Sequence, residues 1–313
     1  MTTYDQLKTA IFADYEIRKG KRRKLAFIEF VRKLCADEGL AFKVEESGSL
    51  MTSRNIIIGD PENADHIVTA HYDTCARMIL PNFITPRNIV MYLIYQILLS
   101  AILLAPAFAA MFLLMRFTDL DLAPLLVFYA LLFAPVYLLM AGPANPHTAN
   151  DNTSGVICVL MSAIQNKVNG RLAFILFDNE ELGLLGSAAY AKSHRDIAAN
   201  KPVINLDCIS DGENMLLHIN KKLRNDADFL KMADRFSSAA YLYGKTPVVP
   251  ARGVTIYPSD QMNFKKGVAI ASLKSSRLLG LYMDRIHTSR DVKFDDTNID
   301  CILTFISSMA NGL

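Results

Sequence analysis

Residues 172–193 read LAFILFDNEELGLLGSAAYAKS, and this stretch decides the fold. Its first six residues are apolar and have the length of a buried β-strand, and residues 183–193 are typical of a helix. Acidic and amide side chains fill the turn between them, at positions 178–181. A strand, a polar turn and a helix form the repeating unit of a helix-covered sheet, in which ligands gather at the carboxyl ends of the strands.

The flanking segments continue this alternation. We expect further strands at 54–58, 66–70, 203–206, 253–256 and 268–273, and further helices at 4–39, 155–168, 226–241 and 297–311. The prediction is an α/β fold with a mixed, largely parallel central sheet and helices on both faces. The basic run RKGKRRK at 18–24 indicates a solvated face or turn, and the alternative is attraction to anionic lipid headgroups.

Bulk composition excludes several classes of protein. At 313 residues the chain has room for one large domain or two, and its net charge of +2 is too small to indicate a nucleic-acid partner. Five widely spaced cysteines do not form a disulfide framework, so we expect a reducing compartment. Charges occur throughout the first thirty residues, so we expect no cleaved secretory signal.

Residues 88–141 interrupt the α/β pattern with two long apolar runs. No charged residue occurs from 88 to 115 or from 122 to 142, and a transmembrane helix needs about 20 apolar residues. We therefore predict a transmembrane helical hairpin at 88–141, inserted into a discontinuous catalytic domain made of residues 1–87 and 142–313. The alternative is a buried helical pair or an apolar lid.

A hairpin leaves both of its flanks on one side of the bilayer. Arg77, Arg87 and the basic N-terminal region lie on that side, whereas the turn between the helices offers Arg116 against Asp119 and Asp121. The positive-inside rule then predicts an integral membrane protein with a cytoplasmic catalytic domain.

Acids and histidines stand mostly where the predicted strands end. They are His71, Asp73, Asp151, Glu180, Glu181, Asp207 and His287. Zinc binds histidine nitrogen and carboxylate oxygen, and a pair of metals is best served by a bridging carboxylate with further ligands for each ion. A single such cluster is weak evidence, but the set in this order predicts metal-assisted hydrolysis.

These motifs resemble a known family. His71-Tyr72-Asp73-Thr74, ANDNTSG at 149–155, DNEELGLLGS at 178–187, Asn205-Leu206-Asp207 and HTSRD at 287–291 are similar to the signature of the family-28 (M28), clan MH zinc aminopeptidases. SDQMNF at 259–264 resembles a further segment of that family. The resemblance implies two Zn²⁺ per chain and a peptide substrate with a free N-terminus, with the lipid bilayer as a second partner if the hairpin inserts.

The resemblance also implies the metal ligands. Asp151 would bridge both zinc ions, His71 and Asp207 would complete one metal, and Glu181 and His287 would complete the other. The remaining histidines of the chain match no ligand position and are expected to be ordinary loop or surface residues.

Two further roles are implied for acids of the same motifs. Glu180 would be the general base that takes a proton from the metal-bridging water and returns it to the leaving amine. Asp73 would orient His71 by accepting its other ring proton, a recurrent arrangement in zinc sites. Asp291 would have a comparable supporting role.

Two departures from the family pattern leave other functions open. Gln261 stands where relatives commonly carry histidine, and Ile286 stands where some carry tyrosine, at positions expected to border the substrate. The alternatives are a glutaminyl cyclase-like acyltransferase with one zinc and a catalytically inactive peptidase-fold membrane binding protein. The complete ligand set weighs against the first, and the intact Glu180 weighs against the second.

Overall fold

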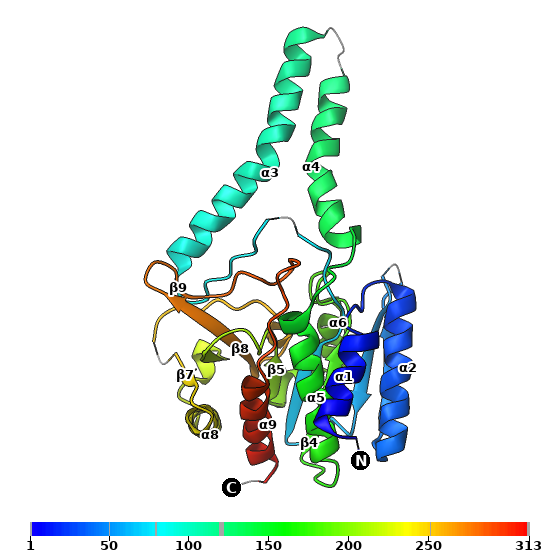
Figure 1. The fold of residues 1–313 in the computed structure, drawn as a ribbon, viewed down its shortest axis with the longest axis vertical. Helices are drawn as coiled ribbons and strands as arrows, with labels where there is room; N and C mark the ends of the chain where they lie inside the picture. The colour runs from blue at the N-terminus through cyan, green and yellow to red at the C-terminus, as the bar shows by residue number, and fades with distance from the viewer. Residues whose placement is uncertain (1, 50, 79, 119–121, 251, 312–313) are drawn as a thin grey trace.

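The computed structural model describes residues 2–49, 51–78, 80–118, 122–250 and 252–311 (Figure 1). Within these residues nine strands form one sheet in the order β1-β2-β4-β3-β5-β8-β6-β7, and β9 pairs with β8. The strands are β1 (Phe42–Ser47), β2 (Ser53–Ile58), β3 (His66–His71), β4 (Leu172–Phe177), β5 (Val203–Leu206), β6 (Asn214–Ile219), β7 (Thr246–Val248), β8 (Gly267–Ser276) and β9 (Gly280–Tyr282).

The described helices lie before, between and after these strands. They are α1 (Tyr4–Asp14), α2 (Lys21–Glu38), α3 (Ile89–Phe117), α4 (Ala123–Ala141), α5 (Gly155–Gln165), α6 (Leu185–Ser193), α7 (Arg195–Asn200), α8 (Ala227–Leu242) and α9 (Asp296–Ala310). Three short helical turns, η1 (Ala149–Ser154), η2 (Lys221–Leu223) and η3 (Asp260–Asn263), complete the order.

The middle of the sheet is parallel, as predicted. Strands β4, β3, β5 and β8 run in one direction, and β1, β2 and β6 pair antiparallel at the flanks. His71 pairs with Phe177, and Asn205 pairs with Thr69, so β3, β4 and β5 end at nearly the same level, while β8 continues beyond them. Because parallel strands end together, the polar residues that follow them meet at one edge of the sheet.

Helices cover both faces of the sheet, and β4 shows why. Phe174 and Leu176 pack into the larger apolar core with α1, α2, α5, α8 and α9, whereas Ile175 and Phe177 pack against α6 and α7. Side chains alternate between faces along a strand, so a run of six apolar residues serves two cores. Each such side chain stabilises the folded state by roughly 1.5–3 kcal/mol when it is fully buried.

Some predicted elements differ from the structure. The helix expected at 4–39 is two helices, α1 and α2, separated by a turn in which Arg18 is buried. The strand expected at 253–256 is wrong, because this run lies in a loop whose Val254 is exposed. Strands β1, β6, β7 and β9 were not predicted, since they are short or lie at the flanks of the sheet.

Helices α3 and α4 pack against each other and project away from the rest of the molecule (Figure 1). Both are long and apolar enough to cross a membrane, and only 6% of the most apolar window of each is buried. Phe108 and Phe128 meet between them, with ring centroids 5.0 Å apart. The two helices are therefore not a buried pair. Asp119 and Asp121, which the orientation argument uses, lie outside the described residues.

Candidate metal centre

The predicted site residues lie on loops that leave one edge of the sheet. His71 is the last residue of β3, and Asp207 directly follows β5. Glu180 and Glu181 follow β4 after two residues, Asp151 lies in the turn η1 before α5, and His287 lies between β9 and α9. All seven predicted residues, including Asp73, come together at this edge.

Asp151 stands between two groups of ligand atoms. Its Oδ1 lies 3.2 Å from Nε2 of His71, which is also 3.5 Å from Oδ1 of Asp207. Its Oδ2 lies 3.0 Å from Nε2 of His287, which is also 3.3 Å from Oε2 of Glu181. The two oxygens of one carboxylate therefore face two different histidines, each with a second acid beside it.

Negative charge is in excess at this edge. Burial raises the pKa of Glu181 to about 8, and burial also raises the pKa of Glu180 well above its ordinary value against the opposing charge of His71. The pKa of His287 is raised to about 10, because Glu181 and Asp151 outweigh the effect of its burial. Buried carboxylates this close together are stabilised either by protons or by cations such as a metal ion.

The donor set fits zinc. Imidazole nitrogens and carboxylate oxygens are ordinary zinc ligands, and both histidines present Nε2 toward the acids. Oε1 of Glu181 is buried, and among the described residues it has no hydrogen-bond partner. A buried carboxylate oxygen that no protein donor satisfies is well suited to a metal ion.

Asp73 lies beside His71, as expected, and its main chain and side chain make different contacts. Nδ1 of His71 contacts the backbone carbonyl of Asp73 at 3.1 Å, while the Asp73 carboxylate lies 3.7 Å away, beyond hydrogen-bond distance. That carboxylate instead accepts the backbone N–H groups of Glu180 at 3.0 Å and Glu181 at 3.3 Å. Asp73 therefore orients His71 through its main chain and fixes the two glutamates through its side chain.

The loop that carries Asp151 is held from two directions. Asp291 accepts the backbone N–H groups of Asn150 at 2.8 Å and Asp151 at 2.9 Å, which supports its predicted positioning role. Oδ1 of Asn152 accepts the N–H of Gly155, and its Nδ2 donates to the carbonyl of Leu206. A Cβ at Gly155 would lie 2.6 Å from that carbonyl oxygen, so only glycine fits there.

Arg18 is a supporting residue that the sequence did not reveal. It is fully buried, and its Nε donates to the carbonyl of Tyr72 while its Nη1 donates to Oγ1 of Thr153. These two acceptors adjoin His71 and lie in the Asp151 turn, so one guanidinium ties both loops together. Burial lowers the pKa of Arg18 to about 10, with Asp73 opposing the shift.

Several backbone conformations at the site are unusual. Asn179, Cys208 and His287 adopt positive φ angles of 56°, 57° and 60°. Such conformations are uncommon outside glycine, and they cluster at functional sites where the surrounding structure enforces them. Lys24 helps to hold Asn179 in its conformation, because its Nζ lies 2.5 Å from the side-chain oxygens of Asp178 and Asn179.

The two departures from the family pattern are buried rather than open to a substrate. Nε2 of Gln261 donates to the carbonyl of Tyr257 at 2.6 Å, and its Oε1 accepts from Nδ2 of Asn205 at 3.3 Å. Ile286 packs in a small apolar cluster with Tyr257. Gln261 thereby contacts Asn205, which lies two positions before Asp207, and Ile286 directly precedes His287.

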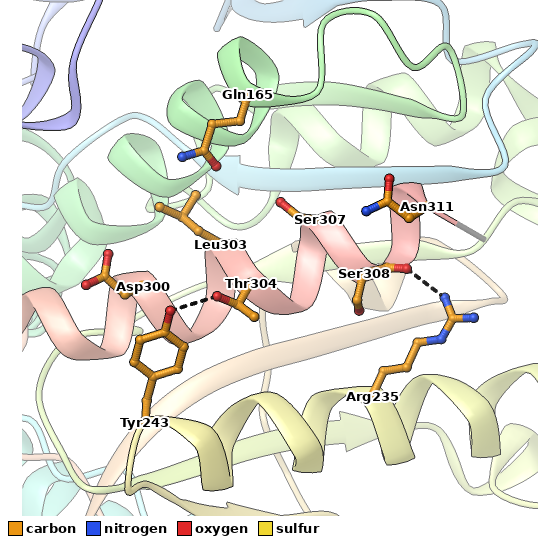
Figure 2. A pocket seen from close by; sticks show the side chains of 9 residues that line it. All are labelled: Gln165, Arg235, Tyr243, Asp300, Leu303, Thr304, Ser307, Ser308 and Asn311. Atoms are coloured by element: carbon orange, nitrogen blue, oxygen red, sulfur yellow. Dashed lines mark hydrogen bonds between the residues drawn. The ribbon is translucent and has the colours of Figure 1, made fainter. Parts of the chain in front are cut away.

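A cavity of about 440 Å³ opens beside the site. Asp73 and Glu181 line one part of it, Lys19 and Lys24 line another, and Met140 of α4 borders it at the foot of the hairpin. A separate cavity of about 710 Å³, lined mainly by α8 and α9, contains none of the predicted site residues (Figure 2). Of these two cavities, the first therefore reaches the candidate site, at Asp73 and Glu181.

Comparison with known sequences identifies a family. A sequence model of peptidase family M28 matches residues 135–306, just over half of the chain. Five of the predicted site residues fall within this range, and His71 and Asp73 precede it. No curated protein matches the chain in sequence.

Solved structures share the fold over almost the whole chain. A zinc-dependent exopeptidase from Parabacteroides distasonis is 17% identical with a TM-score of 0.62, and the match covers 99% of this chain and 98% of that one. A Porphyromonas gingivalis glutaminyl cyclase is also 17% identical, with a TM-score of 0.60 and the same coverage. The LapA aminopeptidase of Legionella pneumophila is 13% identical with a TM-score of 0.56, covering 98% of this chain and 68% of that one. This likeness confirms the predicted fold.

Proposed function

This chain belongs to peptidase family M28, and from that membership we propose that it is a zinc-dependent aminopeptidase that removes N-terminal residues from peptides. The family, together with its exopeptidase and glutaminyl cyclase neighbours, supports a metal-dependent enzyme. The finer assignment to a two-zinc aminopeptidase rests on the arrangement around Asp151.

The observation that carries this proposal is the shared carboxylate. One oxygen of Asp151 faces His71 and the other faces His287, each within 3.2 Å of the respective Nε2. In the proposal His71 and Asp207 hold one zinc, Glu181 and His287 hold the other, and Asp151 contacts both. Zinc bound there would polarise the scissile carbonyl and lower the pKa of water.

The adjacent residues Glu180 and Glu181 have different roles in this proposal. Glu181 faces His287, whereas a side-chain oxygen of Glu180 lies with ligand atoms of His71 and Asp207 within 4.8 Å of one another. Glu180 is the proposed general base, which takes a proton from the attacking water and returns it to the leaving amine. Its raised pKa suits a group that must both accept and release a proton, and Asp73 holds its backbone in place.

We assign membrane anchoring to α3 and α4, as an inserted hairpin at 88–141 within a discontinuous catalytic domain. Their apolar side chains are largely exposed, and such surface is costly in water. Nζ of Lys19 donates to the carbonyl of Met140 at the end of α4, so the basic N-terminal region lies at the foot of the hairpin. That placement agrees with a cytoplasmic catalytic domain beside anionic headgroups.

Glutaminyl cyclase activity is the second candidate, because the cyclase neighbours match the fold as well as the exopeptidase does. Both reactions use a general base beside zinc, and they differ in whether water or the substrate's own amine attacks. The test is to purify the protein in detergent and supply an aminoacyl-nitroanilide and an N-terminal glutamine peptide, with zinc or with a chelator. Zinc-dependent amino-acid release supports the aminopeptidase, whereas zinc-dependent cyclisation alone overturns it.

The anchor has its own test. We expect the full-length protein in the membrane fraction, released by detergent and not by high salt. Recovery of the full-length protein in the soluble fraction without detergent contradicts the hairpin assignment and leaves the chemistry untouched.

A further inference from the structure

Cys75 is buried beside the candidate metal centre for no evident packing reason. It is 3% exposed, yet among the described residues it belongs to none of the apolar clusters of the protein. Cys35, Cys158 and Cys301 lie within the main core, and Cys208 packs in a smaller cluster. A buried cysteine usually behaves as a small apolar side chain, so the position of Cys75 needs another explanation.

The chain direction after β3 brings the Cys75 side chain to the site. His71, Asp73 and Cys75 are two residues apart, and alternate side chains of an extended chain point to the same side. The intervening Tyr72 and Thr74 face away, where Tyr72 stacks on Phe27 and Thr74 Oγ1 accepts the N–H of Arg18.

The backbone around Cys75 is also fixed. Its carbonyl accepts the N–H of Asn145 at 3.1 Å, and Ala76 forms a β-bridge with Ala144. The backbone that carries the thiol is thus held against the segment at Ala144 and Asn145.

The neighbours of the thiol are metal ligands by type. Sγ of Cys75, an oxygen of Glu181 and a ring nitrogen of His287 all lie within 4.8 Å of one another. The Glu181 side chain is 9% exposed, and its Oε1 has no hydrogen-bond partner among the described residues. A thiol, an imidazole and a carboxylate in one largely buried place form a zinc-type donor set.

We infer that Cys75 is an additional ligand, as the thiolate, of the metal position formed by Glu181 and His287. The inference rests on the proposed zinc chemistry and goes beyond it, because it makes the two metal positions chemically unequal. A soft sulfur ligand favours zinc or cadmium over manganese or magnesium at that position. Metal binding there releases the thiol proton to solvent.

Cys208 is the competing thiol and provides the internal control. Its Sγ lies in a similar group with Asp151 and Asp207. However, that thiol packs in an apolar cluster with Tyr257 and donates a hydrogen bond to Oδ1 of Asp207 at 3.2 Å, and these contacts account for its position. The inference therefore assigns sulfur coordination to Cys75 alone.

The test uses the full-length protein in detergent, loaded with cobalt after zinc is removed. Cobalt bound to a thiolate gives an intense sulfur-to-metal charge-transfer band in the near ultraviolet, which oxygen and nitrogen ligands do not give. We expect this band in the wild type, its loss in Cys75→Ser, and its retention in Cys208→Ser and in the core control Cys35→Ser. The affinity of one metal position in Cys75→Ser should fall by at least about 10- to 100-fold, the loss that removal of a group hydrogen-bonded to a metal ligand already causes.

A cobalt-loaded wild type without the band overturns the inference, and so does loss of the band in Cys208→Ser but not in Cys75→Ser. If Cys75→Ser does not fold, the NMR resonance of cadmium bound to Cys208→Ser decides, since a sulfur ligand shifts it strongly downfield and the competing thiol is absent from that variant. Binding of two metals without any sulfur signal refutes only the role of Cys75. A folded protein that binds no metal refutes the proposed function as well.

Discussion

Replacing Arg18 by methionine tests whether the N-terminal region is part of the catalytic scaffold. Methionine is a side chain of similar length, but it removes every side-chain donor and the guanidinium, whose carbon lies 5.5 Å from the centroid of the Phe27 ring. The carbonyls of Tyr72 and Tyr15 then lose their side-chain donor, and Oγ1 of Thr153 keeps only its contact with Oγ1 of Thr148. A buried acceptor left unsatisfied costs about 1–3 kcal/mol, so the two together predict a loss of about 3 kcal/mol in the free energy of unfolding.

The assay is thermal unfolding of the zinc-loaded protein in detergent. A loss of that size lowers the unfolding temperature by roughly 5 °C or more in a chain of this length. Arg32→Met is the matched control, because the Arg32 side chain is 53% exposed and should contribute little. If Arg18→Met unfolds within about 1 kcal/mol of the wild type, the guanidinium does not tie the two loops together and the reasoning is refuted.

Three further predictions concern the site itself. The metal-free protein should lose stability as the pH rises from about 5 to 8. Burial raises the pKa of Glu181 to about 8 in the folded state, so over this range the folded protein keeps a proton that the unfolded chain has released. Added zinc should abolish this dependence on pH, and a metal-free protein that gains stability over the same range would contradict the prediction. Asp73→Asn should lower kcat about 10- to 100-fold with little change in KM, since it weakens the contact that fixes the backbone of Glu180. An equal loss of kcat in an exposed control such as Asp65→Asn would exclude a specific role for Asp73. Gly155→Ala should destabilise the protein by roughly 1–3 kcal/mol in urea unfolding, because the added Cβ meets Asn152 and the carbonyl of Leu206. Gly170→Ala, at an open position, is the control. If both variants are as stable as the wild type, the steric argument is refuted.

The sequence predicted the sheet well where strands are buried on both faces. The bounds of β4 and β5 match the predicted ones, because uninterrupted apolar runs that end in polar residues have few other interpretations. The convergence of Glu180, Glu181 and Asp207 after those strands could be expected from the sequence, since the ends of parallel strands meet at one edge of the sheet. The run at 253–256 looked similar, but it has too few apolar residues to be distinguished from a loop.

What the sequence could not reveal depends on contacts between distant residues. Arg18 belongs to a run of basic residues that is typical of a solvated face, and its burial depends on Tyr72 and Thr153, far along the chain. The separate roles of the Asp73 carbonyl and carboxylate depend on the path of one loop past another. Cys75 carries no motif, and only the folded arrangement places it beside Glu181.

The most direct test of the account measures bound zinc and aminopeptidase turnover in the same preparations of wild type and Glu180→Gln. In the proposed site, Glu180 moves protons and does not hold metal. We therefore expect two zinc ions per chain in both proteins, and turnover lower by about 10²- to 10⁴-fold in Glu180→Gln. One zinc per chain in the wild type, or unchanged turnover in Glu180→Gln, would contradict it.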